Sequence, residues 1–503
     1  MKTTKSIFSF FLLCAPLAPA LASSADSVRS EHLSLWNNIS EKARLNPALH
    51  GAVFNHSYSE LAVNVDYTHQ TTAFVLEKGT GSFLPSVSVN SFVRLNEKTA
   101  VWGSAAYMAG RQYGVKWNST VDYDLLTPYI LADSVGGDTH RERYSFSGGF
   151  ATNVNKFRIG GEAIIRSEHG YTERDPRMRG IVTELTLRAG GAYDALNYRW
   201  ALGVEGNIYK QTNDVEFYNE LGKMTEYQMT GLGTYYARFS GEDASLYYKG
   251  GGIGLSLDAN PLGKCGFYGN AKVWRRGYER QVTSANSVPI TRLVYNAVDA
   301  TFGWQHTKAK RHMAFFANWQ FTKRSGDENI VGKSSSQYYP VTGKLTLYKN
   351  YLMDANLNGV YGVSSSSSSW HTGLKVGLRN NRERYVYPER QMDRMHFYAT
   401  ATGQWMKQLS ERFSLKADID ASYYANMKTS IIMPYTNMES SFTAFVNHNY
   451  RFLKASYACV NAKVRGDCSL GKLGIFLQLG GGAAFCSESE QQTSLQASAG
   501  ITF

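Results

Sequence analysis

The chain has 503 residues and a formal net charge of +12, and it is rich in tyrosine, phenylalanine and glycine but poor in proline. Its mean hydropathy is -0.34, and no stretch after the first 22 residues approaches the roughly eighteen apolar residues of a transmembrane helix. These features exclude a helical membrane protein. The basic excess suits anionic lipids or solutes better than nucleic acid, and we expect most of it to be scattered over loops and interior.

The first 22 residues have the pattern of a secretory signal peptide. Two lysines precede an apolar core at residues 7–13, and small residues occupy positions 20 and 22, ahead of Ser23. The core is too short to span a bilayer. Cys14 offers a lipoprotein signal as an alternative, but Leu13 precedes it where that signal requires a small residue. We expect residues 1–22 to be removed during export.

Residues 23–56 lack the alternation of the rest of the chain. Apolar residues at helical spacing, such as Leu35 and Ile39, predict a short amphipathic helix over about residues 30–44. Asn46-Pro47-Ala48 is expected to end it, because proline restrains the preceding residue and lacks an N–H. This tripeptide, just ahead of the first strand, resembles the long-chain fatty-acid transporter family and related secretion-associated barrels. The resemblance implies that the N-terminal segment folds into a barrel lumen as a plug.

From residue 57 onward, apolar and polar residues alternate almost continuously. The clearest run places apolar residues at every odd position from Phe413 to Tyr423 and polar residues between them. Successive strand side chains point to opposite faces, so such a strand has one apolar face and one polar face. Several runs extend over ten or more residues, which is the span of a membrane strand, whereas strands of globular proteins average five or six. A soluble β-sandwich is therefore the less favoured alternative.

The predicted connections are of two kinds. Long irregular stretches occur near residues 114–141, 211–241, 325–345 and 428–440. Eight short polar turns are expected near residues 96–98, 153–156, 195–197, 260–264, 308–311, 364–369, 409–412 and 465–472. Short turns at one end and long loops at the other are typical of outer-membrane barrels, and eight turns correspond to about eighteen strands. The predicted fold is all-β: a single transmembrane antiparallel β-barrel of about 14–18 strands over residues 57–503, preceded by a short helical plug segment.

The end of the chain supports the same fold. From Leu495 to Phe503 every odd residue is apolar or aromatic and every even one is small or polar. This ending resembles that of outer-membrane β-barrel proteins, whose last strand typically ends in Phe. The resemblance implies location in the bacterial outer membrane, outer-membrane lipid and the barrel-assembly machinery as partners, and Phe503 as an assembly signal. The mature chain as a whole resembles uncharacterised barrel families of Gram-negative bacteria.

Charged residues of both signs fall on the predicted polar face, which would line the lumen. Besides the nine lumen-lining candidates named below, this face carries the charged residues Glu184, Asp299, Asp354, Lys375 and Arg379. A salt-bridge lattice that stiffens the wall is the favoured interpretation, and Asp418 with Asp420 is too small a set for a cation site. The lumen-lining candidates are Arg158, Glu162, Arg166, Arg188, Arg199, Glu205, Lys416, Asp418 and Asp420.

The sequence contains no strong catalytic motif. Residues 466–472 match G-x-x-x-x-G-K, but Leu473 follows and no strand-to-helix context surrounds them, so a glycine-rich turn is expected. No metalloprotease, serine-hydrolase or dinucleotide fingerprint occurs, and we predict no catalytic residue, metal or cofactor. The sequence does not decide between disulfides and free thiols for the four cysteines beyond the signal peptide, which are Cys265, Cys459, Cys468 and Cys486.

Three functions are compatible with these observations. The favoured hypothesis is a porin-like channel or transporter that passes an unknown small solute through a polar lumen. The alternative is a closed barrel whose long outer loops bind a surface ligand or a secretion partner. An outer-membrane hydrolase with scattered catalytic residues is the third option.

Overall fold

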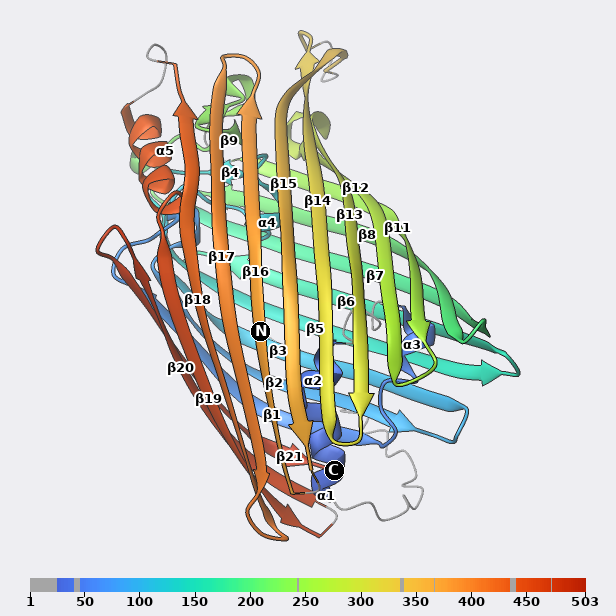
Figure 1. Ribbon diagram of the computed structural model, residues 1–503. Helices are drawn as coiled ribbons and strands as arrows, with labels where there is room; N and C mark the ends of the chain where they lie inside the picture. The colour runs from blue at the N-terminus through green and yellow to red at the C-terminus, as the bar shows by residue number, and fades with distance from the viewer. Residues whose placement is uncertain are drawn as a thin grey trace, which may run out of the picture.

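The computed structural model describes residues 25–39, 46–241, 244–334, 339–365, 367–434, 440–471 and 473–503. The predicted signal peptide lies outside these residues. Eighteen strands form one antiparallel sheet that closes into a barrel (Figure 1). They are β1 Tyr58–Gln70, β2 Gly81–Arg94, β3 Thr99–Val115, β5 Gly137–Val154, β6 Phe157–Tyr171, β7 Arg177–Ala195, β8 Tyr198–Glu216, β11 Ser245–Pro261, β12 Cys265–Val282, β13 Val288–Lys308, β14 Arg311–Val331, β15 Val341–Ser364, β16 Ser368–Tyr385, β17 Arg390–Gln408, β18 Phe413–Ile432, β19 Tyr457–Leu470, β20 Leu473–Cys486 and β21 Gln491–Thr502.

The first and last strands close the barrel. β1 pairs with β21 in a register that sets Leu61 opposite Ile501. Ser59 and Phe503 exchange two backbone hydrogen bonds of 2.9 and 3.0 Å. Every strand of this sheet therefore has two partners, and no edge is left open. The predicted all-β barrel is confirmed, with a strand number at the upper end of the expected range.

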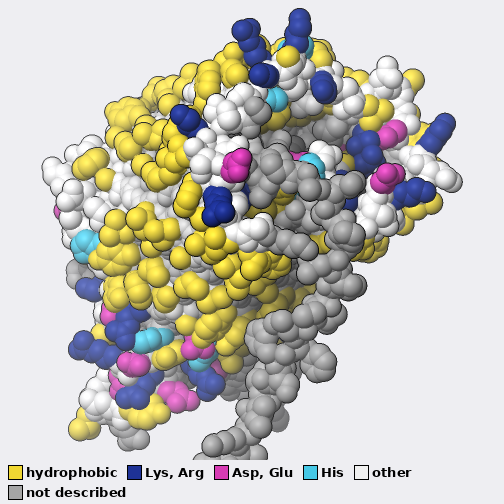
Figure 2. All heavy atoms as spheres, turned by 90° about the horizontal axis from the view of Figure 1, so that it is seen from below, with side chains coloured by type: hydrophobic (Ala, Val, Ile, Leu, Met, Phe, Trp, Pro, Cys, Tyr) yellow, Lys and Arg dark blue, Asp and Glu magenta, His cyan; other side chains and the backbone are white. Residues whose placement is uncertain are grey.

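The outside of the barrel is apolar. Alternate residues of each strand project outward, and large side chains such as Ile253, Phe302 and Leu357 are 71%, 63% and 62% exposed. Figure 2 shows hydrophobic side chains over the outer wall and charged side chains gathered toward its margins. Such a belt on a closed antiparallel barrel faces lipid, so the protein is an outer-membrane β-barrel. None of the described helices combines the length and apolar character needed to cross a membrane.

The connections differ between the two ends. Eight connections of two to four residues lie at the end where β1 begins and β21 ends, which we call the inner end. Nine connections lie at the outer end, and the longest span residues 116–136, 217–244 and 433–456. All eight predicted turns fall at the inner end. The turn expected from residue 465 was wrong in extent, because β19 continues to Leu470 and pairs with β20 throughout.

Short elements complete the fold. A small sheet contains β4 Leu131–Ala132, β9 Tyr227–Gly231 and β10 Thr234–Tyr235. The short 3-10 helices are η2 Leu76–Lys78, η3 Glu220–Gly222, η4 Ala237–Phe239 and η5 Thr283–Ala285. The α-helices are α1 Ala25–Leu33, α2 Leu35–Ile39, α3 Pro47–His50, α4 Tyr123–Leu126 and α5 Ser440–Leu453.

The N-terminal helix differs from the prediction of one continuous element. Ser34 separates α1 from α2, and its hydroxyl accepts a hydrogen bond of 3.2 Å from the Trp36 N–H. Pro47 begins α3 rather than ending a helix, because a proline at the first helical position loses no hydrogen bond. The Asn46 side chain caps α3 by accepting a 3.0 Å hydrogen bond from the Ala48 N–H.

The hydrophobic core lies inside the outer end of the barrel. It joins connection 116–136, connection 217–244 and α5 to lumen-facing side chains of the strands. Two buried arginines hold these connections through their main chain. Arg280 of β12 donates to the carbonyls of Ile130 and Met229 at 3.0 and 3.1 Å, and Arg390 of β17 donates to the carbonyl of Leu232 at 2.9 Å. The outer connections are therefore folded inward.

Candidate ligand-binding cavity in the lumen

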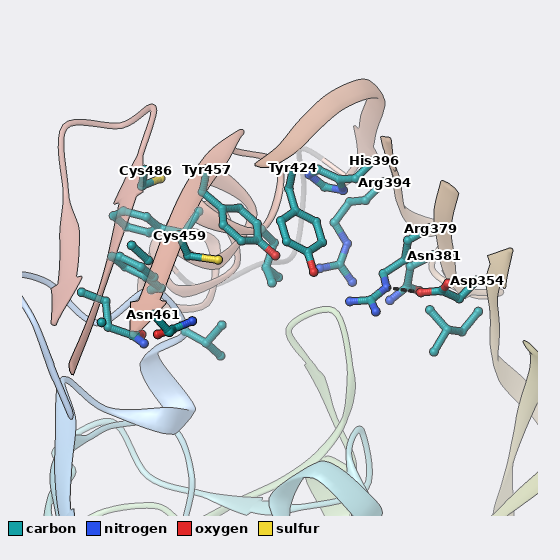
Figure 3. Close-up of a pocket in the computed structure, with 18 of the residues that line it drawn as sticks. Asp354, Arg379, Asn381, Arg394, His396, Tyr424, Tyr457, Cys459, Asn461 and Cys486 are labelled. Carbon is teal, nitrogen blue, oxygen red and sulfur yellow. Dashed lines mark hydrogen bonds and ion pairs between the residues drawn. The ribbon is translucent and has the colours of Figure 1, made fainter. Parts of the chain in front are cut away.

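A cavity of about 790 Å³ lies below the inward-folded connections. Lumen-facing residues of β13 to β21 form its wall, and Phe74 and Val75 of connection 71–80 meet Phe452 and Leu453 at the end of α5 along its margin. Its volume is within the range of small-molecule sites, which are about 300–1,000 Å³. Polar and charged groups from several strands converge on it, as Figure 3 shows.

The first group in this cavity is an ion pair with a tyrosine. Asp354 of β15 and Arg379 of β16 are directly opposite in the ladder, and Arg379 Nε lies 2.9 Å from Asp354 Oδ2. Tyr398 donates its hydroxyl to Asp354 Oδ1 at 2.6 Å, and Asn356 donates to the same oxygen at 3.0 Å. These bonds fix the Asp354 carboxylate and orient the Arg379 guanidinium along the wall.

A row of three tyrosines continues from this group. Tyr398, Tyr424 and Tyr457 are register partners on β17, β18 and β19. Their rings stack with centroids 5.3 and 4.4 Å apart and planes within 21° and 13°. Because the rings stack, the ring faces inside the row are covered by the neighbouring tyrosine. Figure 3 shows Tyr457, Tyr424, Arg394 and Arg379 in succession along one wall of the cavity.

Arg394 of β17 differs from the other cations of this wall. It lines the large cavity and also an adjoining space of about 370 Å³ that reaches the outer connections. Its Nε is buried without a hydrogen-bond partner. Within the described ranges no carboxylate forms an ion pair with it, although Glu383 lines the adjoining space. Burial of a cation with no carboxylate in direct contact is costly, and an acidic group on a ligand would lower that cost.

The outer margin of the cavity is held by a cluster that we call the Glu77 latch, formed by Glu77, Tyr123 and Asn449. Tyr123 donates to Glu77 Oε1 at 2.9 Å, and Asn449 of α5 donates to Glu77 Oε2 at 2.6 Å. The side-chain oxygen Oδ1 of Asn449 accepts a 3.0 Å hydrogen bond from the Leu76 N–H. Burial raises the pKa of the Glu77 carboxyl to about 7. Three outer connections are thus joined at one carboxyl group.

The inner end is occupied by the segment that precedes β1. Asn46 is buried and its amide lies 3.5 Å from Asp258 of β11. It packs where three lumen-facing glycines, Gly160, Gly190 and Gly203, are adjacent on β6, β7 and β8. A Cβ atom at any of them would overlap the segment or crowd a neighbouring side chain. Closer to the chain start, Arg29 donates to the hydroxyls of Ser414 and Ser469.

Three of the nine predicted lumen-lining residues, Glu162, Arg188 and Glu205, lie in an ion-pair lattice on the wall from β6 to β12. Arg188 contacts Glu162 and Glu205 at 3.0 and 2.9 Å, and Glu205 also binds Lys272 and Arg276, each at 2.9 Å. None of the nine candidates is among the residues of the 790 Å³ cavity.

The remaining candidates lie outside that network. Arg166 bridges Asp122 and Glu184. Arg199 pairs with Asp194 at 2.7 Å. For Arg158 the described residues provide no ion-pair partner.

On β18, Lys416 pairs with Asp418 at 3.1 Å, and Asp420 accepts a 2.9 Å hydrogen bond from Asn461. Asp418 also accepts a hydrogen bond from Gln404. Each of the two carboxylates therefore has its own protein partners.

Sequence reasoning identified part of the cavity. Asp299, Asp354 and Arg379 were placed on the polar face and do line the cavity. Arg394 was missed, because the residues around it at the start of β17 do not alternate. The four cysteines carry free thiols, and Cys459 and Cys486 line the cavity.

The sequence from residue 47 to residue 503 matches the model of DUF6850, a family of unknown function. The chain belongs to the DUF6850 family. A comparison of this DUF6850 protein with curated proteins finds no match.

Several solved structures are similar to the DUF6850 barrel. The ferric preacinetobactin receptor BauA from Acinetobacter baumannii has a TM-score of 0.44 at 8% identity, over 89% of this chain and 80% of that one. The siderophore receptor PiuA from the same organism has a TM-score of 0.41 at 7% identity, over 89% and 82%. The copper transporter OprC has a TM-score of 0.40 at 8% identity, over 88% and 80%. At these values the likeness supports no inference about a solute.

Proposed function

We propose that this DUF6850 barrel binds a small solute with an acidic group in its lumen and passes it across the outer membrane by a gated route. The observation that carries the proposal is the 790 Å³ cavity with Arg394 on its wall, where no carboxylate of the described residues forms an ion pair with it. Arg379, held by Asp354, supplies a second guanidinium to the same cavity. Guanidinium groups bind carboxylate and phosphate through paired hydrogen bonds.

Gating is proposed because chain segments occupy both ends of the lumen. At the outer end the Glu77 latch and the buried arginines hold the inward-folded connections. At the inner end the segment before β1 packs against the lumen wall. We propose that residues 23–56 act as a plug, as the Asn46-Pro47-Ala48 resemblance to the fatty-acid transporter family implies. Both closures have to move for a solute to pass.

One observation favours the alternative of a closed interaction barrel. Eighteen strands enclose enough space for an aqueous channel unless something fills it, and here the chain fills much of the lumen itself. In that case the outer connections would present a binding surface, and the cavity would be a packing defect. We propose no enzymatic activity for either version.

Ligand binding tests the first proposal. Purified protein is titrated by calorimetry with small carboxylates, small phosphates and neutral sugars. Arg394→Gln should weaken binding of the anionic ligands at least tenfold, because a hydrogen bond to a charged group contributes about 1.5–3 kcal/mol. Arg292→Gln is the matched control, since Arg292 lies on β13 opposite Glu279 on the outward face, and it should leave the affinity unchanged.

The same titration can contradict the proposal. Absence of binding by every anionic solute, or an equal affinity in the Arg394→Gln variant, would favour the closed interaction barrel. Uptake of the bound solute into proteoliposomes then separates transport from binding alone.

A further inference from the structure

Four cations lie together on the outward, lipid-side face of the barrel near its outer rim: Lys323, Lys349, Arg382 and Arg384. Their direction follows from their neighbours along each strand. Thr322 and Arg324, on either side of Lys323, line the lumen spaces. Of the neighbours of the other three cations, Tyr348, Asn350, Asn381 and Glu383 line these spaces and Tyr385 is buried, so the side chains of the three cations face outward. We call this group the rim cluster.

The register places the rim cluster on two adjacent rungs of the sheet. Lys349 of β15 is directly opposite Arg384 of β16. One rung toward the inner end, Tyr351 lies between Lys323 and Arg382, and the Lys323 ammonium is 5.9 Å from the Tyr351 ring centroid. Like charges directly opposite one another on a sheet are destabilising. The Lys349–Arg384 pair therefore calls for a counter-anion.

The protein provides little negative charge at this place. None of the four cations has an ion-pair partner anywhere in the described part of the chain. The nearest carboxylate in the ladder is Asp393, opposite Arg382, and it accepts a 2.5 Å hydrogen bond from Gln391. On β8 and β11 the comparable outward pair Lys210 and Lys249 is different, because Lys249 has an ion pair of 3.2 Å with Glu279.

The rim cluster also lies at a particular height. Trp319 and Phe321 precede Lys323 on the same face of β14, and their rings stack with planes within 10°. Aromatic residues of this kind mark the boundary between hydrocarbon and headgroups. A lipid whose acyl chains lie along the apolar wall would bring its headgroup to the level of the cations.

We propose that the rim cluster binds the phosphate groups of a phosphorylated glycolipid of the outer leaflet. The two arginines offer planar donor pairs that match phosphate oxygens, and the two lysines add point charges. The adjoining apolar wall accounts for a lipid rather than a free anion. The site is separate from the lumen cavity and is independent of any solute.

Native mass spectrometry of the full protein in non-ionic detergent tests this. The probe is a synthetic lipid A with two phosphates, compared with the same glycolipid without phosphates. Each cation near an anionic headgroup strengthens binding about fivefold, so Lys349→Gln with Arg384→Gln should weaken binding of the phosphorylated lipid about 25-fold. Lys210→Gln with Lys249→Gln removes the same charge and should change it less than about threefold.

Three results would overturn the proposal. They are equal retention of the lipid without phosphates, an equal loss in the two double variants, and displacement of the lipid by inorganic phosphate at similar concentrations. The last result would identify a free-anion site instead. Barrel folding of each variant is checked by heat-dependent migration in electrophoresis. If a variant does not fold, the comparison of the two lipids on the unaltered protein still decides.

Discussion

Glu77 gives the outer closure a dependence on pH. Burial raises the pKa of its carboxyl from 4.5 to about 7, although Asn449 and Tyr123 donate hydrogen bonds that favour the charged form. Between pH 4.5 and 7 the Glu77 carboxyl is thus protonated when the outer connections are packed and ionised when they are separated. The stabilisation of the closed state by the latch is complete below pH 4.5 and is lost as the pH rises through 7.

Hydrogen exchange of the α5 amides checks this prediction. Between pH 4.5 and 8 the free energy that protects α5 should fall by about 3 kcal/mol, after correction for intrinsic exchange. Glu77→Gln should remove most of the fall, because a neutral amide cannot titrate. A fall of the same size in the variant would assign the pH dependence to other groups.

Gly190 controls the approach of the N-terminal segment to the wall. A side chain there would overlap the Asn46 amide oxygen and crowd the Ala48 N–H. Gly190→Val should release the segment, at a cost of about 1–3 kcal/mol, and speed its cleavage by an added protease about tenfold or more. Gly191→Val is the control, because its Cβ would meet nothing nearer than 3.9 Å. Equal cleavage rates would show that the contact does not hold the segment.

Individual residues of the cavity were only partly predictable. Alternation assigns a residue to one face of a strand, which is why Asp354 and Arg379 were placed correctly. It does not give the register between strands, and so it could not show that these two residues are opposite each other. The role of Phe503 in assembly stays a prediction; the structure shows its backbone pairing with Ser59.

At the scale of elements, α5 was missed although the sequence contains its signal. Phe442, Phe445, Val446 and Phe452 recur at helical spacing and are all buried. The stretch lies within a long connection, and its polar residues resemble those of a loop. Its helical form depends on the packing of these apolar residues against connections 116–136 and 217–244, which are distant in sequence.

Phe442 is the main anchor of α5. Its ring lies 5.1, 4.9 and 5.3 Å from the rings of Trp117, Tyr227 and Tyr235. Phe442→Ala should destabilise the docked helix by about 3–5 kcal/mol, seen as faster exchange of the α5 amides, while the barrel keeps its melting temperature. Asn447→Ala, at an exposed position of the same helix, should have no such effect. Loss of the barrel in the Phe442 variant would contradict this separation.

At the scale of the whole molecule, the barrel was predictable and its filling by the outer connections was not. Alternation, turn spacing and the closing strand are local signals that repeat in every strand. The filling depends on contacts between residues far apart in sequence, such as those from Arg280 and Arg390 to inward-folded carbonyls. The sequence therefore indicated a wide lumen with a plug formed by the N-terminal segment, and nothing in it indicated that the outer connections fold inward at the other end.

Two closures in series lead to the last prediction, which concerns conductance in planar bilayers. Deletion of residues 25–56 should leave the barrel closed, because the outer connections remain. Replacement of residues 219–241 by a short Gly-Ser linker should also leave it closed, and the linker can close because Asp214 and Ser245 are opposite each other in the ladder. The two changes together should give a steady conductance, since eighteen strands then enclose free space. Conductance after the loop replacement alone would show that the N-terminal segment is no barrier. A closed double variant would contradict this prediction and favour the interaction barrel, with connection 116–136 and α5 still filling the outer end of the lumen.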